Sequence, residues 1–160
     1  MRMCSRGRTP GHRDGSGLAV AGRFTIRNTS CYEDAEVRAL VKFAMSEVDV
    51  RGVCVNVKNS QHPMRGMAYE GVPYISNAPV QAEYLITIGI GSPERFPRVH
   101  DRKMRGAPSH ELADWREALV AVAAHEAKHI EQFRENKRRS EVACENFEAY
   151  MLRRYREEMI

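Results

Sequence analysis

The feature that most constrains this chain is a helix that has to be buried on every side. Residues 118–124 are all apolar, and a helix that is apolar all round belongs in a protein core. Leu112 and Trp115 precede this run at helical spacing, so the expected helix extends back to them. Pro108 and Ser109 are residues typical of a helix start, and we expect the helix to begin there. The polar residues that follow this run therefore emerge at the edge of a core, half walled by apolar groups and half open to solvent.

Those polar residues form the pattern His125-Glu126-Ala127-Lys128-His129. On a helix, positions i and i+4 share one face, so His125 and His129 can hold one metal ion between their imidazoles. Glu126 then lies beside the ion and can take a proton from a bound water whose pKa zinc lowers to about 7. The pattern predicts zinc-dependent amide hydrolysis with Glu126 as the general base. Its plainer alternative is a pair of partly exposed helix histidines.

A catalytic zinc site needs a third protein ligand. No histidine follows His129, and Gln132 and Glu135 stand where the metzincin extension requires Gly and His. A carboxylate is therefore the expected ligand. We predict a break at residues 136–139 and a second helix capped by Ser140, which carries three glutamates on one face, Glu141, Glu145 and Glu148. Alternatively, these glutamates are solvated and balance Arg153, Arg154 and Arg156.

The rest of the chain shows shorter patterns. We expect strands at residues 24–27, 53–57, 66–71 and 83–90, the last being the clearest, and a helix from Asp34 to about Val48. Residues 91–107 show no regular pattern and indicate a basic loop that contains Phe96, His100 and Lys103.

Composition and charge fit one domain at residues 23–160 after a tail at residues 1–22. The chain has 160 residues, of which 42% are hydrophobic, and a formal charge of +4. Residues 1–23 hold five arginines and Asp14, which gives +4, and the other 20 basic and 20 acidic residues cancel. A short basic tail is typically disordered. Tail-mediated binding of nucleic acid is kept as an alternative, but it is not the expected function.

The cysteines and the hydropathy indicate a reduced, cytoplasmic protein without a membrane span. Cys4, Cys31, Cys54 and Cys144 are scattered, without a disulfide framework and without zinc-ligand spacing, so cysteine ligands are disfavoured. The run at residues 18–21 is too short for a signal peptide, and no stretch approaches the roughly 20 apolar residues that span a bilayer.

Over residues 30–157 the order of elements resembles the gluzincin metallopeptidases. Residues 141–147, Glu-Val-Ala-Cys-Glu-Asn-Phe, are similar to the segment E-x-x-A-[DNE]-x-[FY] of small cytoplasmic and phage-borne members, including ImmA/IrrE-like proteins, with Cys144 in place of alanine. The resemblance implies an α+β fold with a zincin-like minimal core: an N-terminal helix, a three- to four-stranded sheet, the HExxH helix and a glutamate helix. It also implies that His125, His129 and Glu141 bind Zn2+, that Glu126 is catalytic, and that Glu145 orients a ligand.

Two points stay open after this resemblance. In a simple antiparallel helix hairpin that turns near residue 137, His129 lies level with residue 145, so Glu145 is the main alternative to Glu141 as third ligand, and Glu148 is the next. The residue that stabilises the oxyanion is also open, between Tyr150, Tyr155, His100 and the arginines of residues 95–105.

The resemblance also implies how a substrate binds. An extended peptide adds to the edge strand beside the active-site helix, and we expect this edge to be Tyr84–Ile90, with Thr87 and Ile88 in contact with the peptide. The expected function is therefore that of a zinc metallopeptidase acting on a protein or peptide. Its main alternative is a non-catalytic module of the same fold with a structural zinc.

Overall fold

A four-stranded sheet forms the first layer of the chain. The structure is a computed structural model that describes residues 22–71, 82–100 and 110–159. The strands are β1 (Thr25–Asn28), β2 (Val53–Asn59), β3 (Met64–Glu70) and β4 (Tyr84–Ile90), in the spatial order β1-β2-β4-β3. β1, β2 and β4 are parallel, and β3 is antiparallel to β4. All four lie where the sequence predicts strands.

One face of the sheet is apolar because β-branched residues alternate along its central strands. Val55 pairs with Ile86 and Val57 with Ile88, and all four side chains are buried. Side chains two residues apart lie on the same face of a strand. These residues therefore present one continuous surface to the helices.

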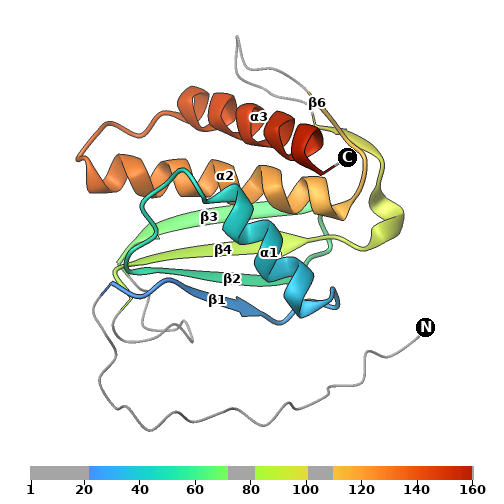
Figure 1. Ribbon diagram of the computed structural model, residues 1–160, viewed down its shortest axis with the longest axis horizontal. Coiled ribbons are helices and arrows are strands. Elements are labelled where there is room, and N and C mark those ends of the chain that lie inside the picture. Colours follow the sequence, from blue (N-terminus) through green and yellow to red (C-terminus); the bar gives the residue numbers. More distant parts are fainter. Residues whose placement is uncertain (1–21, 72–81, 101–109, 160) are drawn as a thin grey trace, which may run out of the picture.

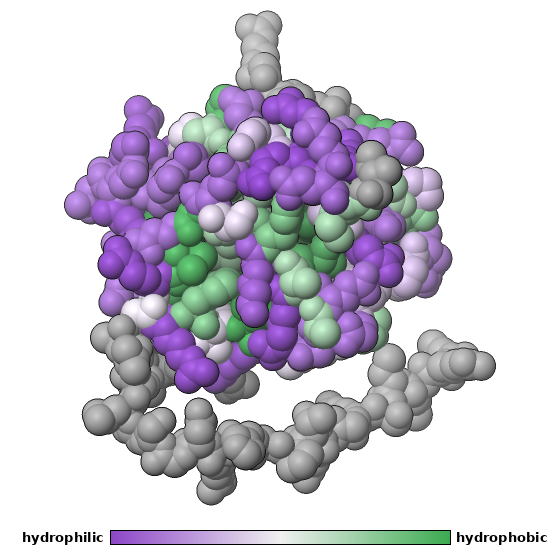
Figure 2. All heavy atoms as spheres, in the orientation of Figure 1, coloured by the Kyte–Doolittle hydropathy of each residue, from purple (hydrophilic) through white to green (hydrophobic). Residues whose placement is uncertain are grey.

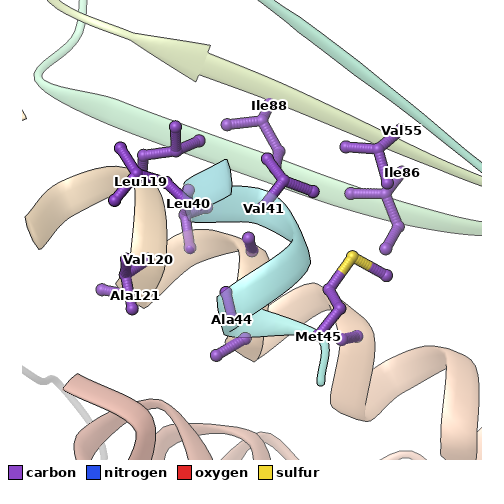
Figure 3. Close-up of a cluster of buried hydrophobic side chains, with 14 of the residues drawn as sticks. Leu40, Val41, Ala44, Met45, Val55, Ile86, Ile88, Leu119, Val120 and Ala121 are labelled. Atoms are coloured by element: carbon purple, nitrogen blue, oxygen red, sulfur yellow. The ribbon is translucent and has the colours of Figure 1, made fainter. Parts of the chain in front are cut away.

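The described residues also form three helices, α1 (Asp34–Ala44), α2 (Trp115–Arg134) and α3 (Glu141–Glu158). α1 and α2 pack over the sheet, and α3 lies against α2 on the side away from the sheet (Figure 1). In the close-up of Figure 3, Val41 of α1 and Met45, the C-cap of this helix, lie between the strands and α2. The chain is thus a mixed α+β protein with a small sheet and three helices.

The outer surface over α3 is largely hydrophilic, whereas hydrophobic side chains gather lower, towards the middle of the same view (Figure 2). None of the helices within the described ranges combines the length and the apolar character needed to cross a membrane.

The run at residues 118–124 is buried as predicted, with every side chain at most 4% exposed. The predicted start of its helix is wrong. Residues His110–Leu112 form a strand, β6, that pairs with β5 (Arg98–His100), and α2 begins only after Asp114. The Asp114 carboxylate accepts from the Glu117 N–H, and the Glu117 carboxylate accepts from the Ala113 N–H. This reciprocal cap fixes the first turn.

Two further expectations need correction. α1 ends at Ala44 and not near Val48, because its C-cap, Met45, leaves helical geometry. Residues 91–107, expected to have no regular structure, contain a short 3-10 helix, η1 (Pro93–Arg95), and β5. Lys103, Pro108, Ser109, Cys4 and the tail up to residue 21 lie outside the described residues.

Candidate metal centre

The histidines of the motif lie on one face of α2, where the helix leaves the core. Their ring centroids are 5.2 Å apart. His129 is buried, with 1% of its side chain exposed, and His125 is 12% exposed. The pair therefore stands at the boundary between the apolar interior and solvent, as the sequence predicts.

Glu141, at the start of α3, faces both rings. Its Oε2 lies 3.1 Å from His125 Nε2, and its Oε1 lies 3.1 Å from His129 Nε2. Burial alone would raise the pKa of Glu141, but the two histidines hold that pKa below its usual value, so the group is a carboxylate at neutral pH. Two ligand atoms about 2.1 Å from one tetrahedral zinc ion lie roughly 3.4 Å apart. Each of these two oxygen–nitrogen distances is thus close to the distance between two ligand atoms of one zinc ion.

The end of α2 explains why Glu141 reaches the histidines. Asn136 has a φ of 51°, and the N–H groups of Asn136 and Lys137 donate to the carbonyls of Phe133 and Gln132. This is the Schellman pattern of helix termination. Ser140 then caps α3 by accepting from the Ala143 N–H, as predicted. The chain turns at once, and the first turn of α3 lies beside the last turns of α2.

Gln132 fixes the position of this second helix. Its amide nitrogen donates to the Ser140 carbonyl at 3.2 Å, and its Oε1 accepts from the Ser140 N–H at 3.3 Å. The same Oε1 lies 3.1 Å from His129 Nδ1. In the tautomer whose Nδ1–H donates to Gln132, the lone pair of Nε2 is available to bind a metal ion. Gln132 therefore orients a histidine and places the carboxylate opposite it.

His125 has a buried carboxylate behind it. Glu148, 1% exposed, holds Oε1 3.7 Å from His125 Nδ1 and Oε2 3.3 Å from His110 Nε2. Such a group behind a ligating imidazole sets its tautomer and orientation. Glu145 is the residue expected in this role from the sequence. Glu145 is also buried, one turn along α3 from Glu141.

Cys144 lies next to the two histidines, although its position in the sequence disfavours it as a zinc ligand. His125, His129 and Cys144 offer ligand atoms that all lie within 4.8 Å of one another, so this group could hold a metal ion. The Cys144 Sγ is 3.3 Å from His129 Nδ1, on the side of the ring opposite Nε2. Burial raises the pKa of the thiol to about 12. A thiol has to lose its proton to bind a metal, whereas Glu141 is already a carboxylate at neutral pH.

Glu126 lies next to this group in an apolar setting. It is 6% exposed, and no described group forms a hydrogen bond with its Oε2. Burial, followed by the charge of Glu141, raises the pKa of Glu126 to about 7. A carboxylate with such a pKa can accept and release a proton near neutral pH.

Gly66 of β3 makes room for Glu126. A Cβ built at position 66 would lie 2.6 Å from Val122 Cγ2 and 2.8 Å from Glu126 Oε1. The close approach of β3 to the motif therefore depends on glycine. Gly66 sits in a strand predicted from sequence, but nothing in the sequence paired that strand with Glu126.

The predicted peptide-binding strand is not at the edge of the sheet. β4 lies between β2 and β3, and Thr87 pairs with Asn56 on one side and Met67 on the other. Ile88 is fully buried. Main-chain groups that already pair on both sides cannot bind a further strand. The expectation that Tyr84–Ile90, with Thr87 and Ile88, is the edge strand is therefore wrong, and the edge beside α2 is β3.

The predicted oxyanion donors lie in different places. The Tyr150 hydroxyl donates to Glu47 on the surface, and the Tyr155 ring packs on Phe43 of α1. These contacts draw both tyrosines towards α1 and not towards the histidines. The His100 ring lies 6.0 Å from that of His110, which contacts Glu148. His100 is therefore linked to the histidine site through two described side chains.

Comparisons of the chain with protein-family models, curated proteins and solved structures found no match. A candidate function therefore rests on the arrangement of the side chains.

Proposed function

We propose that this chain is a zinc-dependent peptidase of the gluzincin type, with a zincin-like core. The observation that carries the proposal is the position of Glu141, whose two oxygens each lie 3.1 Å from the Nε2 of a different motif histidine. Two His nitrogens and one carboxylate are the donor set of known catalytic zinc sites, which leave a fourth position open. Gln132 and Glu148 behind the rings support the same assignment.

His125, His129 and Glu141 would hold the ion, and Glu126 would carry the proton. A bound zinc ion supplies Lewis-acid chemistry, because it polarises a peptide carbonyl and lowers the pKa of water. Glu126 accepts a proton from the attacking water and donates it to the leaving amine. Its pKa of about 7 suits both steps. The buried run at residues 118–124 limits water access on one side of the site.

We place the substrate along β3 and not along β4. β3 is the outer strand of the sheet next to α2, and Gly66 brings its backbone close to Glu126. An extended peptide that pairs with β3 would pass beside the motif. The α+β layers of the chain are consistent with such a strand-plus-helix site.

The test combines metal analysis with peptide cleavage. We expect about one zinc per chain in the purified wild-type protein, and cleavage of a mixed peptide library detected by mass spectrometry. Glu126→Gln should retain zinc and lose cleavage by a factor of at least about 100, because it removes the proton carrier. His129→Ala and Glu141→Ala should lose zinc and cleavage together.

Glu145→Ala is the matched control, because it removes a buried glutamate from the next turn of the same helix. If Glu145→Ala loses zinc and Glu141→Ala does not, the assignment of the third ligand is wrong. If the zinc-loaded wild type cleaves no peptide, the protein is a binding module and the proposed activity fails.

A further inference from the structure

Two cavities of about 440 Å³ each border the start of β3, and basic side chains line both. The first cavity includes Lys58, His62 and Arg65, and the second includes His62, Arg65, Arg98 and His100. The two cavities share His62 and Arg65 and are therefore neighbours. No described residue that lines either cavity is acidic.

This cluster contrasts with the rest of the domain. Residues 24–160 carry 20 basic and 20 acidic side chains, so their formal charge is zero. Among the described lining residues, Lys58, Arg65 and Arg98 are thus a local excess of positive charge. Such an excess attracts anionic groups, and it does so more strongly in a hollow than on a flat surface.

The direction of the β3 side chains relates this charge to the proposed substrate path. Gly66 and Ala68 face α2 and the core. Arg65, Met67 and Tyr69 face the opposite side of the sheet and are exposed. A strand that pairs with β3 presents alternate side chains to these two sides, next to its cross-strand neighbours. Every second side chain would therefore point towards Arg65 and the first cavity.

We propose that the substrate of this site is an extended peptide with acidic side chains at alternate positions, which Arg65 and Arg98 recognise beside β3. The inference rests on the proposed peptidase function, because that function places a peptide along β3. Peptide main chain would pair with the edge of β3, and the basic cluster would select among sequences. The side chains between the acidic ones would face Glu126 and the histidines.

A peptide suits this surface better than a nucleic acid. Single-stranded nucleic acids bind basic grooves in which several aromatic rings stack on the bases. Tyr69 is the single aromatic residue among the described ones that line the two cavities, apart from the histidines. The edge of β3 instead offers amide and carbonyl groups at the spacing of another strand.

The test measures binding of two labelled dodecapeptides of equal composition by fluorescence anisotropy. One alternates Glu and Thr, and the other repeats Glu-Glu-Thr-Thr. The protein is the zinc-loaded full chain with Glu126→Gln, which prevents cleavage. We expect the alternating peptide to bind about fivefold more tightly, because only its acids all face the basic side.

Arg65→Glu should weaken binding of the alternating peptide about tenfold, and the matched control Arg153→Glu should not. Arg153 is an exposed arginine of α3, a helix that packs on α2 and away from the sheet. Equal binding of the two peptides, or equal effects of the two variants, would overturn the inference. The inference would also be overturned if an oligothymidylate displaced the peptide and if its own binding were lost in Arg65→Glu.

The two proposals fail separately. In one outcome, the wild type cleaves library peptides that show no enrichment of Asp or Glu at alternate positions. This result would contradict the proposed specificity for acidic peptides and would leave the proposed peptidase activity in place. The opposite result is that the alternating peptide binds through Arg65 but the wild type cleaves no peptide. This result would support the binding site for acidic peptides and would contradict the proposed peptidase activity.

Discussion

Gln132 is the residue that joins the two halves of the candidate site. It contacts His129 Nδ1 and both main-chain groups of Ser140. We predict that Gln132→Ala lowers zinc affinity about 10- to 100-fold, the usual effect of losing a partner behind a ligating histidine. Competition with a chelating dye measures it. Gln61→Ala, the same truncation at an exposed position, should leave the affinity unchanged, and an equal loss in both variants would contradict the role.

Glu126 should make the metal-free protein sensitive to pH. Its pKa rises from 4.5 to about 7 on folding, mainly because of burial, so folding disfavours its charged form. The wild type therefore loses stability as pH rises from about 4.5 to 7, whereas Glu126→Gln has no such loss. We expect the variant to be more stable by about 3 kcal/mol at pH 8 and nearly equal at pH 4. Urea denaturation at pH 4 and pH 8 measures the free energy of unfolding of both proteins. A stability difference that is the same at the two pH values would contradict the predicted role of Glu126.

Among the elements, the sequence predicts the two helices of the site better than the strand beside it. The i, i+4 histidines and the Ser140 cap are local patterns, and both are read directly from the chain. Gln132 lies three residues after His129 and Glu148 seven after Glu141, so same-face spacing could have indicated both. Cys144, in contrast, meets His129 only because α3 folds back on α2, which no spacing encodes.

The edge strand was mispredicted for a physical reason. β4 has five fully buried residues, Leu85, Ile86, Ile88, Gly89 and Ile90, and a near-continuous apolar run is typical of an inner strand. β3 alternates exposed and less exposed residues, which is typical of a strand with one solvated face. The strength of the β4 pattern thus marked the centre of the sheet and not its edge.

Gly66 gives a prediction at the contact between β3 and α2. We expect Gly66→Ala to displace Glu126 and to lower kcat about 10- to 100-fold, since small displacements of a proton carrier have effects of that size. Zinc content should stay near that of the wild type. Gly89→Ala is the control, because its Cβ would meet Ser60 at 2.9 Å on the other face of the sheet. Equal losses of kcat in both variants would show general destabilisation instead.

For the whole molecule, a shared ion would join α2 to α3. A ligand present at 100 times its Kd stabilises a folded protein by about 2.7 kcal/mol, which in a chain of this size raises Tm by about 5 to 10 °C. We expect that rise on adding zinc to the metal-free protein, measured by calorimetry. Glu141→Ala should abolish most of it. A rise of the same size in this variant would mean that the stabilising ion binds elsewhere.

The open side of β3 has a consequence for contacts between copies of the protein. In the described part of the chain, β3 pairs only with β4, and unpaired strand edges promote edge-to-edge aggregation. Arg65 lies within this edge and is exposed. Two copies that met through β3 would bring their basic clusters together without compensating acids, and this repulsion opposes pairing. An uncharged residue at position 65 would remove that protection, so the same arginine that is proposed to select an acidic peptide also keeps the edge free for it.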